Sequence, residues 1–548
     1  MPDIVHEGAR RPLAVGRSLF DEADALAVAV PTSCRRSGRC HECVVSVEEG
    51  EASLSPRTPA ESFLPAGFRL ACQATVTRAD RDVAFSVLRR RLRILGAAED
   101  EPPTGPLDPA VRRDGDAVRY EGEWLDAVRG RLVGAALDLG TTSVVLELVD
   151  LETGRTLRAA AFENPQRFGG SDVLSRISYD ADHPGELRRA LRRALNHELQ
   201  EAYRALGLDR HEVYELVVVG NPTMRDLFLG LDVGPIGRYP YRSVTEESAR
   251  AGSVAGTAVT RLAHELGILI HPRGRVWAAP LVASHVGADT AADLVATDFA
   301  AQPGVSLLVD IGTNTEVVLG ARGRLLAASC PAGPAFEGGG VRHGMAGADG
   351  AIEAATWRDG RFEVRTIGGA APEGICGSGL VDLLAEGRRA GLLSDVSTVA
   401  GGRPTMPVLP DRGIDLSGGD LGHLAQAKAA NASGQRILLR RLGLAPADLD
   451  RVFLAGAFAN SLDPVRAIAI GLLPPVPLER VRRVGNASVR GARRLLLSTS
   501  RRAELTAILR RVEHVELEAE PDYFEVFVDG LRLEPLWEPE GRQAREAS

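Results

Sequence analysis

Lysine is almost absent from this sequence: Lys428 is the only one among 65 basic residues, and the others are arginines. A P-loop needs a lysine to reach the terminal phosphates of a nucleotide, so the sequence excludes that kind of nucleotide site. No stretch supplies the roughly 18 consecutive apolar residues that a membrane helix needs, and the first residues hold no apolar run before a signal-peptidase site. We therefore expect a cytoplasmic protein with no membrane contact.

Cysteine is scarce as well, and six cysteines in a chain of 548 residues cannot form a disulfide framework. Positive charge is not in excess either, since the formal net charge is −8 and a dedicated nucleic-acid binder is usually basic. Hydrophobic residues make up 44% and charged residues 25%, as in an ordinary globular protein. The charge therefore predicts no nucleic-acid partner. A chain of this length is too long for one core, so we expect two to four domains.

Changes of composition divide the chain into five expected parts. Residues 1–88 alternate apolar and polar positions, as short strands do. Residues 89–130 mix basic, acidic, proline and glycine residues, which predicts a linker with one ordered segment. Strands and helices then alternate through a middle region at 131–210 and a C-terminal domain at 211–535, before a polar tail at 536–548. The alternation predicts an α/β core with mixed sheets.

Four of the six cysteines cluster near the N-terminus, at Cys34, Cys40, Cys43 and Cys72. The spacing Cys-x5-Cys-x2-Cys-x28-Cys places three thiols on a loop of small residues and the fourth on a neighbouring strand. Iron–sulfur clusters need soft thiolates that converge in this way. A zinc site or buried free thiols are the alternatives, but structural zinc usually pairs two short Cys-x2–4-Cys knuckles. The pattern resembles the [2Fe–2S] ferredoxins, whose fold is a β-grasp.

A strand followed by Asp-x-Gly-Thr occurs twice, at 136–148 and 308–319, and a third strand runs into Gly-Ala-Phe-Ala-Asn at 456–460. Glycine lets the backbone approach a phosphate, hydroxyl groups bind its oxygens, and aspartate can hold hydrated Mg²⁺. One such turn alone is weak evidence, since any β-turn uses Asp and Gly. The candidates are, for catalysis, Asp138, Asp310 and Glu316 and, for nucleotide binding, Gly140, Thr141, Thr142, Ser143, Gly312, Thr313, Asn314, Gly456, Ala457 and Asn460.

The three motifs in this order resemble the phosphate-1, phosphate-2 and adenosine motifs of the actin/Hsp70/sugar-kinase superfamily. A Gly-rich turn that opens an apolar helix at 374–387 looks like the second connecting segment of that superfamily, which adds Gly377 and Ser378 as candidates. Lys428 is a further candidate, because a lone lysine among arginines is suited to a compact phosphate or carboxylate contact. An ordinary surface lysine is the alternative. The other two cysteines, Cys330 and Cys376, are expected to be small core residues.

A ferredoxin module, a linker and such an ATPase in one chain are similar to the reductive activators of corrinoid proteins, the RACo/RamA-type family. Further matching segments are GNPTM (220–224), VGADT (286–290) and AGPAFEGGGVRHGM (332–345). The resemblance implies a multidomain α+β protein in which a β-grasp [2Fe–2S] ferredoxin precedes a two-lobed, RNase H-like α/β ATPase. It also implies the activity: ATP-dependent delivery of an electron from the cluster, which returns a corrinoid protein from Co(II) to Co(I).

The resemblance implies cofactors and partners too. We expect one [2Fe–2S] cluster, because no cysteine follows Cys376, and ATP with Mg²⁺. The expected partners are a corrinoid protein or cobalamin-dependent methyltransferase and a separate electron donor, either a flavodoxin, a ferredoxin or a reductase. A homodimer is compatible with the family and is not readable from the sequence.

Other functions stay open at this point. One is a small-molecule kinase of the sugar-kinase superfamily with a fused ferredoxin-type redox sensor. Another is a simple ferredoxin electron carrier whose ATPase lobe has degenerated. An activator of CoA dehydratases would hold a [4Fe–4S] cluster between subunits, and the local set of four cysteines argues against it.

Overall fold

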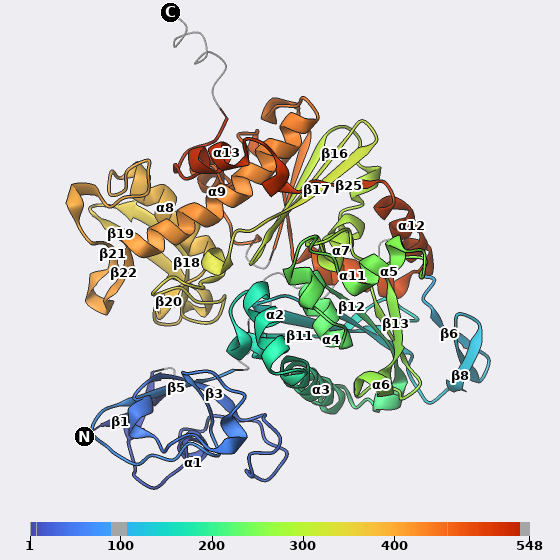
Figure 1. Cartoon of the computed structure of the whole chain (residues 1–548), viewed down its shortest axis with the longest axis horizontal. Coiled ribbons are helices and arrows are strands. Elements are labelled where there is room, and N and C mark those ends of the chain that lie inside the picture. The colour runs from blue at the N-terminus through green and yellow to red at the C-terminus, as the bar shows by residue number, and fades with distance from the viewer. Residues whose placement is uncertain (1, 7, 89–91, 93–106, 457–458, 538–548) are drawn as a thin grey trace, which may run out of the picture.

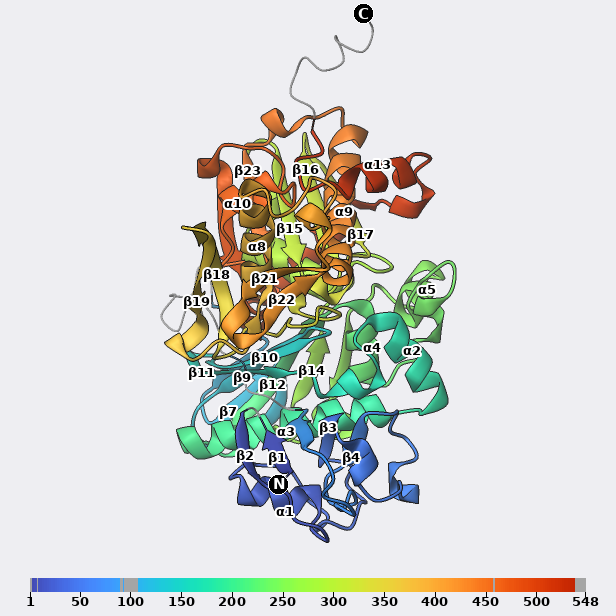
Figure 2. The ribbon, with the colours of Figure 1, turned by 90° about the vertical axis from the view of Figure 1, so that its left-hand side faces the viewer.

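The computed structural model describes residues 2–6, 8–88, 92, 107–456 and 459–537. They form a small N-terminal domain, a first lobe and a second lobe (Figure 1). In Figure 2 the N-terminal domain lies at the bottom, the first lobe above it and the second lobe at the top. No helix in these ranges is long and apolar enough to cross a membrane.

The N-terminal domain, residues 2–88, is a five-stranded mixed sheet of order β2-β1-β5-β3-β4 with one helix packed on it. The helix begins after Ser18, whose hydroxyl accepts a hydrogen bond from the Asp21 amide. The Asp21 carboxylate in turn accepts one from the Ser18 amide. This capping box fixes the start of the helix. The sheet and its covering helix form the predicted β-grasp. The elements are β1 (Asp3–His6), β2 (Ala9–Pro12), α1 (Leu19–Ala25), β3 (Val44–Glu49), β4 (Phe68–Leu70) and β5 (Val83–Val87).

Part of the expected linker forms a three-stranded antiparallel sheet of order β6-β7-β8. Its apolar side chains pack against the first lobe and helix α12. Asp108 anchors its start by accepting hydrogen bonds from the Thr499 hydroxyl at 3.0 Å and the Ser500 amide at 2.9 Å. Residues 89–91 and 93–106 lie outside the described residues. The elements are β6 (Val111–Asp114), β7 (Ala117–Tyr120), β8 (Glu123–Ala127) and α12 (Thr499–Leu509).

The first lobe is a six-stranded sheet of order β11-β10-β9-β12-β14-β13 with helices on both faces. Its central strand β12 is buried at every position, as a strand between two helical layers must be. The elements are β9 (Val133–Leu139), β10 (Ser143–Asp150), β11 (Thr156–Glu163), η3 (Pro165–Gly169), α2 (Val173–Asp182), α3 (Glu186–Leu206), β12 (Val213–Gly220), α4 (Pro222–Leu229), η5 (Gly234–Gly237), α5 (Val244–Arg250), β13 (Val259–Leu262), α6 (Ala263–Leu266), β14 (Arg275–Ala278) and α7 (Ala288–Ala296).

The second lobe is a six-stranded sheet of order β24-β23-β15-β16-β17-β25, with two smaller sheets beside it. Figure 1 shows the long helix α9 running across this lobe. The elements are β15 (Ser306–Ile311), β16 (Thr315–Ala321), β17 (Arg324–Cys330), η7 (Pro334–Glu337), β18 (Ala351–Arg358), β19 (Arg361–Thr366), β20 (Gly374–Ile375), α8 (Gly377–Arg389), β21 (Thr405–Leu409), β22 (Ile414–Ser417), α9 (Gly418–Arg441), β23 (Arg451–Ala455), α10 (Pro464–Ala469), β24 (Val481–Gly485), α11 (Ala487–Leu497), β25 (Val512–His514) and α13 (Tyr523–Gly530).

The two large sheets share one topology. In the first lobe β9, β10 and β11 are consecutive antiparallel strands, and β12 then pairs in parallel with β9 on its other side. In the second lobe β15, β16 and β17 are related in the same way, and β23 takes the place of β12. Each lobe therefore carries the strand–Asp-x-Gly-Thr–strand unit in its first hairpin. The two-lobed fold predicted from the repeat of this unit is confirmed.

Helices α7 and α11 lie against each other and contact both large sheets, so they form the junction between the lobes. They approach closely because α11 has a glycine at the crossing: a Cβ on Gly491 would lie 2.0 Å from the Ala292 carbonyl oxygen of α7. The helix that opens at Gly377, in which the sequence suggested a connecting segment, is α8. That helix packs within the second lobe on β18 and α10 and does not form the junction. The helix that packs on α7 at the junction is α11.

We expect Gly491→Ala to lower the stability of the protein. Alanine is ordinarily the better helix former by about 1 kcal/mol, but here its methyl group would force α7 and α11 apart, at a cost of about 1–3 kcal/mol. The midpoint of thermal unfolding should fall. The matched control is Gly422→Ala in α9, where no atom lies within 4 Å of the new methyl group, and its midpoint should be unchanged or higher. Equal midpoints for both variants would show that the crossing does not depend on the glycine.

Candidate functional site: a cysteine loop beside a two-lobed cleft

The four N-terminal cysteines lie together in the N-terminal domain. Cys34, Cys40 and Cys43 come from the loop before β3, and Cys72 follows β4. The Sγ atoms of Cys43 and Cys72 are 3.3 Å apart, and the thiol of Cys34 contacts Cys40, so the sulfurs form two neighbouring pairs. Cys40 and Cys43 are buried, and the other two are partly exposed. The structure brings together all four residues predicted from the spacing.

The cysteine loop directs backbone amides at the sulfurs. Burial raises the pKa of the Cys34 thiol, but hydrogen bonds from the Ser37 hydroxyl and from loop amides outweigh it and lower that pKa to about 6. A hydrogen bond with Cys43, together with the Gly38 amide, likewise lowers the pKa of Cys72 to about 6. Thiolates stabilised by amides are the soft donors that an iron–sulfur cluster needs. The left-handed conformations that turn the amides inward occur at Arg35, Arg36, Gly38 and His41.

The remaining cysteines are separate from this site. Cys330 and Cys376 are both buried among apolar side chains, which confirms the prediction that they are core residues. In the described ranges, no group of three or more His, Cys, Asp or Glu side chains surrounds a single point as the ligands of one metal ion would. The arrangement of the four N-terminal cysteines in pairs fits a two-iron cluster.

The cysteine loop also docks on helix α3 of the first lobe. His41 lies 3.1 Å from the Glu186 carboxylate and 3.3 Å from the Arg189 guanidinium. The Glu42 carboxylate lies 3.4 Å from Arg193 of the same helix. Figure 1 shows α3 directly beside the N-terminal domain. The two residues between Cys40 and Cys43 are therefore held by helix α3 of the first lobe.

The two predicted phosphate loops face each other across the junction between the lobes. The first lies between β9 and β10, the second between β15 and β16. The hydroxyl groups of Thr142 and Thr313, one from each loop, are 3.4 Å apart. Asp138 and Asp310, near the ends of β9 and β15, repel each other electrostatically. The structure thus joins residues that are 171 positions apart in the sequence.

The third motif closes this site from the side of β23. Gly456 has a φ of +117°, and a Cβ there would lie 2.3 Å from the Ile311 carbonyl oxygen. Only glycine allows the backbone to pass so near the phosphate-2 loop. The Asn460 side chain packs against Gly485. Ala457, also predicted to bind nucleotide, lies outside the described residues.

The other predicted residues lie in three places. Glu316 on β16 joins the site, since its carboxylate accepts a hydrogen bond from Ser329 at 3.1 Å and lies near Asp310. Ser378 is instead engaged within the second lobe, where its hydroxyl donates to the Glu353 carbonyl at 2.7 Å. Gly377 likewise lies in the second lobe, where it begins α8. The remaining candidates belong to the two phosphate loops: Gly140, Thr141, Ser143, Gly312 and Asn314.

Lys428 lies apart from the phosphate loops. Its ammonium is buried beneath the C-terminal segment and donates to the backbone carbonyls of Arg532 at 2.5 Å and Glu534 at 3.4 Å. Burial lowers the pKa of Lys428 to about 7, against the attraction of Glu534. These contacts give the lysine a structural role in holding the C-terminal segment on α9.

Several residues of the site were not predicted. Asn486, the residue before α11, donates a hydrogen bond to Asp138 at 2.9 Å. Asp289 and Asp293 on α7 are close to Asp310. Two of the family-matching segments gave a signal without an assigned role: VGADT contains Asp289, and AGPAFEGGGVRHGM contains Glu337. Glu337 of η7 accepts a hydrogen bond from Thr142 at 2.8 Å and another from Thr313.

The phosphate-1 loop is held by three side chains from other segments. Asn164 donates to the Gly140 carbonyl at 2.9 Å, and Asn221 donates to the Thr141 hydroxyl at 3.0 Å. Arg176, which is fully buried, donates to the Thr141 carbonyl at 2.7 Å. Both asparagines also cap a helical turn that starts with proline. The GNPTM segment noted in the sequence therefore acts as a support for this loop.

Carboxyl groups, most of them partly buried, crowd the site. Burial, with repulsion from neighbouring carboxylates, raises the pKa of Asp138 and of Asp289 to about 7. Burial also raises the pKa of Asp310, Glu316 and Glu337. A divalent cation with oxygen ligands would neutralise such a group. The residues present therefore fit a Mg²⁺–nucleotide complex.

A cavity of about 420 Å³ connects the phosphate-1 loop with the N-terminal domain. One wall comes from strand β5 and Glu48 of that domain, a second from the phosphate-1 loop and η3, and a third from η7 and the segment after it. Arg167 of η3 bridges two of these walls, since it donates to the Ser86 hydroxyl at 3.1 Å and pairs with Glu163 at 3.2 Å. The nucleotide-type site and the cysteine domain thus share a cavity.

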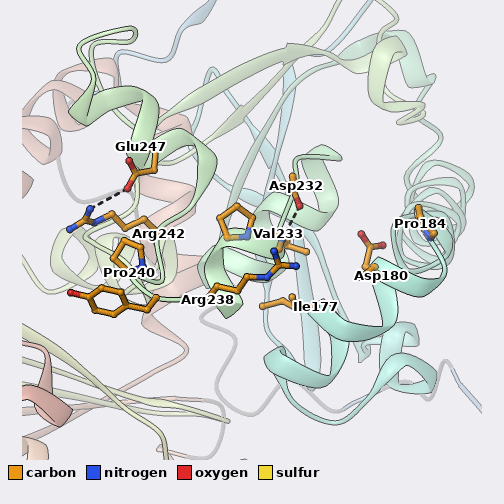
Figure 3. Close-up of a pocket in the computed structure, with 13 residues that line it drawn as sticks. Ile177, Asp180, Pro184, Asp232, Val233, Arg238, Pro240, Arg242 and Glu247 are labelled. Atoms are coloured by element: carbon orange, nitrogen blue, oxygen red, sulfur yellow. Dashed lines mark hydrogen bonds and ion pairs between the residues drawn. The ribbon is translucent and has the colours of Figure 1, made fainter.

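A second cavity, of about 550 Å³, lies on the outside of the first lobe, between α2 and the segment 232–247 (Figure 3). Arg242 and Glu247 form an ion pair of 3.2 Å at its edge. None of the residues predicted from the sequence lines it.

Two lobes of one topology, each with a phosphate loop, joined to a cysteine-rich β-grasp domain, define a ferredoxin-linked protein of the ASKHA class. Residues 304–537 match the family model for the C-terminal domain of RACo, the ASKHA domain. Residues 133–302 match the RACo middle region, and residues 5–77 match the 2Fe-2S iron-sulfur cluster binding domain. The predicted cofactors, a [2Fe–2S] cluster and ATP, are those of the two domain types.

Known proteins of the same organisation identify the family. The corrinoid activation enzyme RamQ of Eubacterium limosum is 32% identical over 424 residues, 72% of this chain and 70% of that one. The [Co(II) methylated amine-specific corrinoid protein] reductase of Methanosarcina barkeri is 26% identical over 403 residues, 70% of this chain and 73% of its own. A solved structure titled reductive activator for corrinoid,iron-sulfur protein superposes with a TM-score of 0.70 and 28% identity, over 97% of this chain and 98% of that one.

The chain therefore belongs to the family of reductive activators of corrinoid proteins, as its sequence predicted.

Proposed function

We propose that this protein reduces the Co(II) form of a corrinoid protein to Co(I), with an electron from its [2Fe–2S] cluster and with ATP to drive the step. The observation that carries the proposal is the cavity shared by the phosphate-1 loop and strand β5 of the cysteine domain. A change at the nucleotide site reaches the electron-carrying domain directly through this cavity. Both named relatives act on corrinoid proteins, which supports this class of partner.

The residues divide the work as follows. Cys34 and Cys40 would hold one iron, and Cys43 and Cys72 the other, with loop amides stabilising the sulfurs. When bound, the cluster supplies one electron at a time. The phosphate-loop hydroxyls would bind nucleotide phosphates, with Asp138, Asp310 and Glu316 holding hydrated Mg²⁺ and the glycine of the third motif admitting the adenosine.

The proposal extends to the surroundings of the reaction. All six cysteines are accounted for by one cluster and two core residues, so the electron must come from a separate donor, a flavodoxin, ferredoxin or reductase. We propose a cytoplasmic protein without nucleic-acid or membrane partners, in line with the net charge of −8, and a homodimer as the state to test first.

An absorption assay with a Co(II) corrinoid protein tests the function. With a reductant and Mg²⁺–ATP we expect the Co(I) band to appear at least tenfold faster than without ATP, because only the nucleotide makes the uphill electron transfer favourable. The control omits the protein and keeps the reductant. A Co(I) band that forms equally fast without ATP would favour the simple electron carrier. ATP-dependent phosphorylation of an added sugar, without any effect on cobalt, would favour the kinase.

A further inference from the structure

Glu337 occupies an unusual place for a carboxylate. It ends η7 in the second lobe, and one of its oxygens accepts a hydrogen bond from Thr142 at 2.8 Å and a second from Thr313. These hydroxyls belong to the phosphate-1 and phosphate-2 loops. A single anionic oxygen therefore joins the two loops, and with them the two lobes.

A phosphate oxygen and a carboxylate oxygen are both anionic acceptors, and both form charge-assisted hydrogen bonds with hydroxyl groups. Two such groups cannot share the same two donors at this distance, since their charges also repel each other. We propose that Glu337 takes the place of a nucleotide phosphate oxygen in the nucleotide-free protein, and that ATP binds by displacing it. The inference rests on the proposed ATP site.

The surroundings of Glu337 favour its release once a phosphate arrives. Glu337 is partly buried, and Asp310 repels its carboxylate while Arg176 attracts it. Burial raises the pKa of Glu337, and the two threonine hydroxyls oppose that shift. The threonine contacts thus offset part of the cost of burying the carboxylate. When phosphate takes these donors, the carboxylate loses its partners and its buried place becomes unfavourable.

The backbone on both sides of η7 can follow the side chain. Gly333 before it and Gly338 after it both have positive φ values, of 73° and 87°. Two more glycines follow at once, Gly339 and Gly340. Gly338 also passes so close to Met345 that a Cβ there would lie 2.4 Å from the Met345 amide nitrogen. A segment with glycines at both ends absorbs changes of backbone angle at low cost.

A movement of this segment would be felt by the cysteine domain. The stretch from Pro334 to Ala346 supplies one wall of the 420 Å³ cavity, and Glu48 with Phe85–Val87 of the N-terminal domain supplies another. Displacement of Glu337 therefore changes the shape of a cavity that the cysteine domain helps to form. This is a direct mechanical route from the nucleotide to the electron-carrying domain.

Nucleotide affinity tests the displacement. We expect Glu337→Ala to bind Mg²⁺–ATP about tenfold more tightly than the unchanged protein, because the phosphate no longer has to replace a competing acceptor. AMP, which lacks the outer phosphates, should bind both proteins equally. Glu48→Gln removes a carboxylate from the same cavity that makes no contact with the threonines, and its affinity for Mg²⁺–ATP should stay within about twofold. Calorimetric titration measures the nucleotide affinities of the unchanged protein and of the two variants.

Hydrogen–deuterium exchange of the full-length protein tests the movement. Amides of 333–346 should exchange faster when a non-hydrolysable ATP analogue is bound, and in Glu337→Ala they should exchange faster without nucleotide. Equal ATP affinity and equal exchange in the variant and the unchanged protein would overturn the inference. So would a loss of ATP turnover in Glu337→Gln at unchanged affinity, since the carboxylate would then act on the reacting phosphate. Failure of the unchanged protein to bind any nucleotide would remove the ATP site itself.

Discussion

We expect Cys72→Ala to abolish the electron-transfer activity completely while nucleotide binding continues. Cys72 is the only predicted ligand outside the cysteine loop, and its sulfur lies 3.3 Å from that of Cys43. Without it one iron would have a single thiolate, so the cluster should not assemble. The phosphate loops lie in the two lobes. One face of the first lobe shares a core with the N-terminal domain, but its other face and the second lobe have cores without residues of that domain, so nucleotide binding should continue. Iron and sulfide content, visible absorption and ATP binding together measure the effect.

Cys376→Ala is the matched control for this experiment. Cys376 is buried in the second lobe, where its thiol donates to the Ile352 carbonyl at 3.3 Å, and the variant should keep full iron content. Circular dichroism should accompany the Cys72 measurement, because a cluster contributes to the folding of the domain that holds it. A Cys72→Ala protein with two irons and normal absorption would show that the ligand set is wrong.

Patterns among neighbouring residues of the sequence predicted most of the fold and both cofactors. Cys34, Cys40 and Cys43 lie within one loop, so their spacing alone indicates a shared site. Each Asp-x-Gly-Thr turn sits inside one hairpin, in which a strand, a tight turn and a strand are encoded by consecutive residues. Because the unit occurs twice, the sequence also predicted two related lobes. Predictions of this kind depend on neighbours in the chain.

The unpredicted residues depend on contacts between distant segments. Asn486 meets Asp138 across 348 positions, and Glu337 meets Thr142 across 195. Asn486 resembles an ordinary helix cap in the sequence, and Glu337 lies in a family-matching segment that gives no hint of its contact with the threonines. Lys428 shows the reverse case, since its rarity suggested phosphate chemistry and the structure shows it on backbone carbonyls. Rarity in composition says nothing about position in the fold.

The second large effect concerns the partly buried carboxyl group of Asp138. Burial and the nearby Asp289 and Asp310 raise its pKa from 3.8 to about 7. The folded protein therefore binds this proton more tightly than the unfolded chain does, and stability is lost as pH rises from about 4 to 7. Above pH 7 the ionised carboxylate is an uncompensated charge unless a cation is bound. Asp138→Asn removes that charge and can still accept the hydrogen bond from Asn486.

At pH 8, without nucleotide or Mg²⁺, we expect Asp138→Asn to be more stable than the unchanged protein by about 2 kcal/mol. The advantage should shrink steadily as the pH falls toward 4. ATP hydrolysis should fall about a hundredfold or more, because the group that would hold hydrated Mg²⁺ is gone, while the absorption of the cluster stays unchanged. Thermal unfolding across this pH range and ATPase assays measure both effects. A variant that is less stable at every pH would mean that Asp138 is needed for folding. Higher stability at pH 8 together with lost ATP turnover would show that the charge of Asp138 is retained for function at the expense of stability.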